Sequence, residues 1–305
     1  MALNSDTLAN ETIQFKHGVG STKKRKRAFA TLQWPSKQKL ALYVTLSSIA
    51  IILCLPFYYM MVTAFKSSEE LASLTINLGI TQPTLEPIRM LLDGTIYIKA
   101  AFNSFWVAFF ITFGNIILCP LAGYAFVQHQ FPGRDKIFIA LLATMMIPGA
   151  VLLVPSFLLA RDFGWINTYL PIIIPVLASP FYVFLSRQFI AKIPDAIIKA
   201  ARIDGCSELR IFFQIVLPLC KPLMASIGIL SFLSAWNSFI GPMIFLLEEE
   251  SYTLPLVIGL LQGKFGGFEN VQMAGALLSI VPVLVVFFIF QKKIIESFAS
   301  SGMKE

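Results

Sequence analysis

The sequence predicts an all-α membrane protein with six transmembrane helices. Of its 305 residues, 56% are hydrophobic and only 13% are charged, whereas a soluble domain carries about 25% charged residues. A helix rises about 1.5 Å per residue and needs about 20 residues to cross a hydrocarbon core of about 30 Å. Six stretches of 20 to 25 residues contain no Asp, Glu, Lys or Arg: 41–64, 100–124, 137–159, 166–186, 222–246 and 271–290. This composition excludes a soluble enzyme and a disordered protein.

The six stretches have the pattern of helices and not of barrel strands. Strands of a membrane barrel alternate apolar and polar residues over segments of about ten. The runs IFIALLATMM at 137–146 and VPVLVVFFIF at 281–290 do not alternate. Prolines recur within the stretches, among them Pro120, Pro148 and Pro180. Each can bend its helix, although proline is also generally common in membrane helices.

The distribution of Lys and Arg predicts the orientation in the membrane, because cytoplasmic segments carry an excess of these residues. Nineteen lie in the N-terminal segment and the loops on its side, and five lie in the other loops. Both termini are therefore expected to be cytoplasmic. The predicted organisation is a basic tail at 1–40, a transmembrane domain at 41–290 and a second tail at 291–305.

The densest basic run, Lys23–Arg27, shortly precedes the first stretch. A nuclear localisation signal or a nucleic-acid patch is one interpretation of such a run. An anchor at the cytoplasmic face of the membrane is the simpler one, and we adopt it. No nucleic-acid partner is expected.

The residues needed for catalysis or for metal binding are missing from the sequence pattern. The cysteines are Cys54, Cys119, Cys206 and Cys220, and the histidines are His17 and His129. Their positions show no metal-ligand spacing and no CxxC pair. We therefore expect no disulfide, metal or cofactor. The sequence also lacks the GxxxxGK[ST] loop that binds ATP phosphates. An intramembrane enzyme is excluded because its acid, base or nucleophile pairs are absent.

Polarity within the predicted spans is neutral. None of them holds a charged residue, which argues against an ion-coupled carrier. Asn115 lies in the second span, and Ser234, Trp236 and Asn237 lie in the fifth. Hydroxyls, amides and an indole can hydrogen-bond and stack on an uncharged polyhydroxylated solute. They can equally join helices to one another, and both interpretations remain open.

The loop 187–221, between the fourth and fifth spans, carries a strong helix pattern. Pro194 and Asp195 favour the start of a helix, and Gly205 favours its end. Ser207 can cap a second helix. We expect one face of that helix to lie against the bundle, at Leu209, Phe212, Phe213, Val216 and Leu217. The alternative is an ordinary pair of interfacial helices.

This loop resembles the EAA loop of permease subunits of binding-protein-dependent ABC importers. That motif runs E-A-A-x-x-D-G and is followed by a hydrophobic run that ends in proline. The matching residues are Ala200, Ala201, Asp204, Gly205 and Pro218. Further motifs resemble the carbohydrate branch, near the smaller maltose-type permease: Asn103-Ser104, Ala122-Gly123-Tyr124-Ala125, Phe131-Pro132-Gly133-Arg134, Ile147-Pro148, Gly164-Trp165-Ile166-Asn167-Thr168 and Trp236-Asn237. The resemblance covers about residues 40–300 and implies the type I importer permease fold.

The resemblance implies a function and a set of partners. The short helix of the loop would be the coupling helix that docks on a cytoplasmic ATPase subunit. The chain would work in the cell membrane with ATPase subunits, a second permease and a substrate-binding protein, and the cargo would be a sugar or oligosaccharide. The loop 247–270 matches the position of the loop that reaches toward the binding protein, although a solvated acidic turn is equally expected there.

One departure from the motif concerns the docking site. The acidic first position of the family is Lys199 in this chain. Either the ATPase presents an acid there, or docking relies on the Ala200-Ala201 surface and the Gly205 turn, or coupling is weakened. The C-terminal Gly302–Glu305 also departs from the Gly-rich ending of the family. The alternatives for function are a permease for a non-sugar solute and a self-sufficient channel or secondary carrier.

Overall fold

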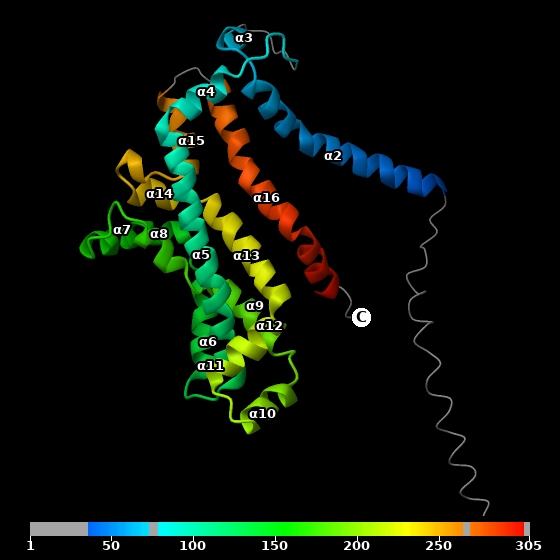
Figure 1. The fold of residues 1–305 in the computed structure, drawn as a ribbon, viewed down its shortest axis with the longest axis vertical. Helices are drawn as coiled ribbons and strands as arrows, with labels where there is room; N and C mark the ends of the chain where they lie inside the picture. The colour runs from blue at the N-terminus through cyan, green and yellow to red at the C-terminus, as the bar shows by residue number, and fades with distance from the viewer. Residues whose placement is uncertain (1–35, 73–78, 265–268, 302–305) are drawn as a thin grey trace, which may run out of the picture. The chain divides into compact units, whose positions relative to one another are not determined.

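The computed structural model describes residues 36–72, 79–264 and 269–301. All regular elements of these residues are helical, as predicted (Figure 1). The α-helices are α2 (Ser36–Ala64), α3 (Ser68–Ala72), α4 (Glu86–Asp93), α5 (Thr95–Gln128), α6 (Arg134–Ala143), α7 (Leu153–Asp162), α8 (Leu170–Ile173), α9 (Pro180–Ile190), α10 (Asp195–Ile203), α11 (Glu208–Ile211), α12 (Leu217–Leu219), α13 (Lys221–Trp236), α14 (Ile240–Phe245), α15 (Leu254–Lys264) and α16 (Glu269–Ser301). Short 3-10 turns are η2 (Thr144–Met146), η3 (Gly149–Leu152), η4 (Ile174–Val176) and η6 (Glu249–Ser251), and η5 (Phe212–Val216) is π-helical.

The chain divides into two compact units, residues 1–56 and 57–305. Of the first unit the structure describes 36–56, which form the N-terminal part of α2. The basic run Lys23–Arg27 and the C-terminal Gly302–Glu305 lie outside the described residues. The expected C-terminal tail begins as a continuation of α16, which runs to Ser301.

Four helical segments are long and apolar enough to cross a membrane. They are Lys39–Ala64, Ile96–Gln128, Leu170–Ile190 and Glu269–Ile289. Two further segments satisfy the criterion only as bent pairs, Arg134–Met146 with Gly149–Asp162 and Glu208–Leu219 with Lys221–Trp236. The described residues therefore contain four to six candidate spans, and six require that each bent pair counts as one.

The expected third span, 137–159, is not one straight helix. Its two halves meet at 94°. Ile147 is extended, with φ −83° and ψ 118°, because the residue before a proline is disfavoured in the helical region. Pro148 also lacks the N–H that would continue the helix. The sequence pattern indicated a possible bend at Pro148, but it did not predict that the span breaks into two helical segments.

The expected fifth span, 222–246, also ends early. Helix α13 stops at Trp236, and α14 starts only at Ile240. At the other end, α13 begins after an 80° bend from the preceding helical segment. Pro222 lies in the first turn of α13, where its missing N–H costs no helical hydrogen bond.

The backbone breaks a third time inside the candidate span Leu170–Ile190. Between η4 and α9, Leu177 and Ser179 are extended and Ala178 has a φ of +53°. A left-handed conformation costs a non-glycine residue roughly 1–2 kcal/mol. Pro180 then opens α9. The strain at Ala178 is tolerated because the surrounding helices fix the chain on both sides of it.

The second helix of the 187–221 loop buries only part of the face that we expected. Phe212 and Val216 are fully buried as expected, and Leu217 is half-buried. Leu209 is 62% exposed and Phe213 is 48% exposed, whereas Ile211, outside the expected set, is fully buried. The π-helical η5 holds more residues per turn than an α-helix, which rotates the apolar face. A regular 3.6-residue period therefore predicted Leu209 and Phe213 wrongly.

The centre of the bundle is formed by α5, which packs along both α9 and α13. Its closest approach to α9 is at Gly123, where an added Cβ would lie 2.6 Å from the Ser186 Cβ and 2.8 Å from the Arg187 nitrogen. Small residues let membrane helices approach closely in this way. The neighbouring core contains Tyr124, Val183, Ile190 and Phe212.

Gly123→Ala is expected to destabilise the α5–α9 pair, because the new methyl group meets backbone atoms that cannot move aside. Overpacking of this kind costs about 1–3 kcal/mol of unfolding free energy. Thermal unfolding in detergent measures the effect as a lower midpoint. Gly149→Ala is the matched control, since its Cβ meets no atom within 4 Å. Equal midpoints for the two variants would contradict the close approach.

Candidate functional site

A cavity of about 180 Å³ lies among α5, α9, α13 and the broken segment before α9. This volume exceeds the space that one water molecule needs. Its lining residues are Ile111, Asn115, Ile172, Val176, Ser179, Tyr182, Ser231, Ser234, Ala235 and Ser238. They supply hydroxyls, an amide and apolar groups, and none of this lining carries a charge. The cavity can therefore offer hydrogen bonds to a neutral solute or to water.

Asn115 holds the wall of this cavity together. Its side-chain Nδ2 donates to Ser231 Oγ at 3.0 Å, and its Oδ1 accepts from the Ser179 backbone N–H at 3.3 Å. The Cys119 thiol lies 3.4 Å from the same Oδ1. Asn115 is only 1% exposed. One side chain thus joins α5, α13 and the break before α9.

The hydrogen bond from Ser179 N–H to Asn115 satisfies a backbone group that would otherwise be left without a partner at the break. Non-helical backbone at membrane depth is tolerated only where protein or a water-filled cavity satisfies its polar groups. Asn115 satisfies the N–H of Ser179, and the carbonyl of Ser179 accepts from the N–H of Val183. Both the break before α9 and the end of α13 contribute lining residues, Ser179 and Ser238.

The structure separates the four polar residues that we expected to line a pathway. Asn115 and Ser234 line the cavity. Trp236 is 3% exposed, stacks on Phe232 with ring centroids 5.7 Å apart, and donates from Nε1 to the Ser279 carbonyl of α16. Asn237 is exposed, and its Nδ2 donates to the Leu233 carbonyl at 2.8 Å. Neither is among the lining residues.

Tyr182 lines the cavity but was not singled out in the sequence. It follows Ser179 and Pro180 in the first turn of α9. The available signal was the Ser-Pro pair, because a proline preceded by an extended residue often marks a break. A break inside an apolar run places the residues after it, here including Tyr182, in the first turn of the next helix.

The loop between α9 and α13 contains the EAA-like residues. Lys199, Ala200 and Asp204 are exposed on α10 and at its end, whereas Ala201 is buried. Gly205 has a φ of +77° and ends the helix. Pro218 lies in α12 and is exposed.

The end of α10 has the hydrogen bonds of a Schellman motif. The Cys206 N–H donates to the Ala201 carbonyl at 3.0 Å, and the Gly205 N–H donates to the Arg202 carbonyl at 3.1 Å. This turn needs a left-handed residue, which explains the glycine. Beside it, Ile203 is 86% exposed. Helix α10 projects from this end of the bundle (Figure 1), and its exposed Ile203 and tight turn give it a small, partly apolar surface.

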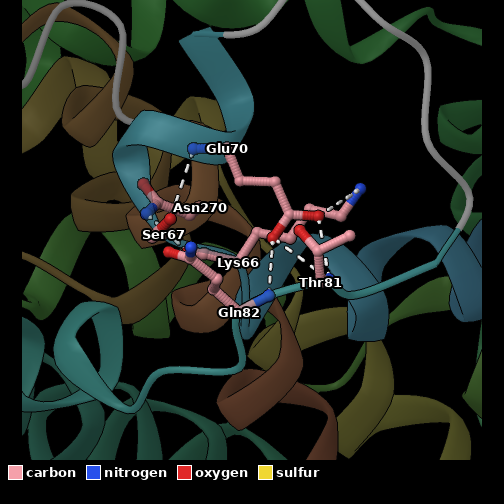
Figure 2. Close-up of polar contacts among 6 residues, drawn as sticks. All are labelled: Lys66, Ser67, Glu70, Thr81, Gln82 and Asn270. Carbon is pink, nitrogen blue, oxygen red and sulfur yellow. Dashed lines mark hydrogen bonds and ion pairs between the residues drawn. The ribbon is translucent and has the colours of Figure 1, made fainter.

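A polar cluster lies near the opposite end, around α3 (Figures 1 and 2). The Glu70 carboxylate accepts from the N–H groups of Thr81 and Gln82 at 3.2 Å and lies 3.8 Å from Lys66 Nζ. Asn270, at the start of α16, donates to the Lys66 carbonyl at 3.0 Å. Burial raises the pKa of the Glu70 carboxyl. The N–H donors and the Lys66 ammonium together lower it by more, so the pKa lies below its usual value. The cluster fastens the segment after α2 to α16.

No group of His, Cys, Asp and Glu among the described residues is arranged to hold a metal ion. The four cysteines are free in the structure. The cavity, the α10 surface and the Glu70 cluster are features of the described residues that are available for function.

Known proteins are similar to this chain in sequence and in fold. A family model described as the binding-protein-dependent transport system inner membrane component matches residues 85–298. The chain is 34% identical over 264 residues to an arabinooligosaccharides transport system permease protein of Halalkalibacterium halodurans, covering 84% of this chain and 93% of that protein. It is 27% identical over 259 residues to a lactose transport system permease protein of Rhizobium radiobacter, covering 85% and 94%. A chain of a bacterial ABC transporter that imports alginate superposes with a TM-score of 0.76 and 24% identity, covering 86% and 99%.

The family match and the similar permease proteins show that the chain is a transport subunit and not an enzyme. The chain belongs to the family of binding-protein-dependent transport system inner membrane components, the permease subunits of ABC importers. It is a multi-pass protein of the inner membrane. The predicted family is confirmed.

Proposed function

We propose that the chain forms half of the translocation pathway of an ATP-driven importer for a sugar or oligosaccharide. The observation that carries the proposal is the cavity lined by Asn115, Ser234 and further hydroxyls beside broken helices. Neutral donors and acceptors match the hydroxyls of a sugar. The names of the arabinooligosaccharide and lactose relatives support this class of cargo.

The proposed complex contains a second permease subunit, ATPase subunits and a substrate-binding protein. In this arrangement each bent pair is one of six spans, and both termini are cytoplasmic, as the distribution of Lys and Arg favours. The segments 1–40 and 291–305 would flank the transmembrane domain at 41–290. The α10 surface would then face the cytoplasm, where ATP is hydrolysed.

We propose that α10 is the ATPase-docking helix. The exposed Ala200 and Ile203 and the rigid Gly205 turn form a surface that can enter a groove of a partner. Lys199 is exposed on the same helix, so its charge stays hydrated where the family has an acid. Docking through the small and apolar residues does not require that acid.

Gly205→Val is expected to abolish recovery of the ATPase subunit with the solubilised permease. A β-branched residue is strongly disfavoured at positive φ, so the turn that ends α10 cannot keep its form. Co-purification from the native membrane, followed by identification of the bound proteins, measures the loss. Gly164→Val is the matched control, because Gly164 also has a positive φ, of 69°, but lies between α7 and α8. Full recovery of the ATPase with Gly205→Val would refute docking through this turn.

Ser234→Leu is expected to lower sugar uptake about tenfold or more, because the larger apolar side chain fills the cavity and removes a hydroxyl. The ATPase subunit should remain bound, since α10 is untouched. Uptake of a radiolabelled arabinooligosaccharide by cells that express the variant is the assay. Ser226→Leu, on the same helix but outside the cavity lining, is the control. Normal uptake by Ser234→Leu would remove the cavity from the pathway.

A further inference from the structure

We propose that Tyr124, Glu208 and Arg202 form a polar clamp that transmits movement of α10 to the cavity through α5. This proposal rests on the proposed function of α10 as the docking helix. The three residues come from three different places: the last turns of α5, the first turn of α11 and the last turn of α10. They act as positioning residues, because none of them touches the cavity.

The geometry of the polar clamp is that of a strong, charge-assisted contact. Arg202 donates to Glu208 twice, from Nε at 2.7 Å and from a terminal nitrogen at 3.2 Å. Tyr124 donates from its hydroxyl to the same carboxylate at 2.7 Å. Fork-shaped pairs of this type fix orientation as well as distance. The hydrogen bond to Glu208 also raises the pKa of the Arg202 guanidinium above its usual value.

The clamp matters because α10 has few other attachments to the bundle. Only Ile198 and Ala201 are buried among its residues 195–203. At its start, Asp195 accepts from Gln128, in the last turn of α5, at 3.3 Å. Both ends of α10 are thus tied to the same end of α5 by polar contacts. A force on α10 reaches α5 through these contacts.

The other end of the path is the cavity. Helix α5 runs from Thr95 to Gln128 without a break, although Pro120 lies inside it. Asn115 lies about 13 Å before Tyr124 along the helix axis. Between them, Gly123 fixes α5 closely against α9. Asn115 in turn holds Ser179 and Ser231 of the cavity wall. A displacement of the last turn of α5 therefore changes the positions of all three helices around the cavity.

The ring and the hydroxyl of Tyr124 have separate contacts, since the ring packs in the core and the hydroxyl donates to Glu208. The residue is 2% exposed, and its ring packs 5.7 Å from the ring of Phe212. Replacement by phenylalanine keeps this packing and removes only the hydrogen bond to Glu208. The substitution therefore tests the polar contact without opening a gap in the core.

The experiment compares Tyr124→Phe, Glu208→Gln and the double variant in the complete importer, purified with its own subunits. Three quantities are measured: the amount of ATPase subunit bound, ATP hydrolysis stimulated by the sugar-loaded binding protein, and sugar uptake. We expect the ATPase to remain bound, while stimulation and uptake fall at least about fivefold, the lower end of usual coupling effects. The double variant should be no worse than Glu208→Gln. Glu208→Gln already weakens the contact with Tyr124 that Tyr124→Phe removes, together with the contacts of Glu208 with Arg202 and with His129, 3.4 Å away at the end of α5.

The control is Gln214→Ala, which removes a hydrogen bond to Arg210 at 3.0 Å within the same loop but has no link to α5. It should keep stimulation and uptake. Unchanged stimulation in Tyr124→Phe and Glu208→Gln would overturn the clamp, and so would loss of the bound ATPase, since that would assign these residues to docking. Retention of the ATPase by Gly205→Val would instead refute the docking helix itself, so the two failures can be told apart.

Discussion

The hydrogen bonds of Asn115 are the interaction on which the rest of the structure depends. A helix that breaks inside a membrane exposes backbone groups that lipid cannot satisfy. Here the break at Ala178 and Ser179 is stabilised by one buried amide that also holds Ser231 of α13. Because protein groups satisfy the backbone at this break, the bundle can keep a polar cavity beside it.

Helix α5 connects this interaction to the rest of the molecule. It carries Asn115 at the cavity, Gly123 at the close crossing with α9, and Tyr124 at the contact with Glu208. If α10 is the ATPase-docking helix that we propose, its surface and the cavity belong to one mechanical unit. Alternating exposure of a solute site would require such a unit, since the proposed ATPase would supply energy at a distance from the solute.

The sequence predicted the helical class and the bounds of α10 well, at Pro194-Asp195 and Gly205, because both depend on local composition and spacing. It named Pro148 as a possible bend, but it could not predict the break there or the early end of α13, since a membrane helix can keep or lose a proline bend according to its neighbours. The exposure of Leu209 and Phe213 was missed because a π-helical turn does not follow the 3.6-residue period. Trp236 packs against α16, a tertiary contact that no spacing within the fifth span encodes.

The most direct test of the cavity as a pathway is the reactivity of Ser234→Cys with a membrane-impermeant thiol reagent, in a chain without its four native cysteines. Such a reagent attacks a thiolate, which forms only in contact with water. We expect Ser234→Cys to react in the assembled importer, and we expect transported sugar to slow the reaction. The control is Leu230→Cys, which is 45% exposed on α13 but lies outside the cavity lining and should not react. Equal reactivity of the two positions, or none at Ser234→Cys, would contradict it.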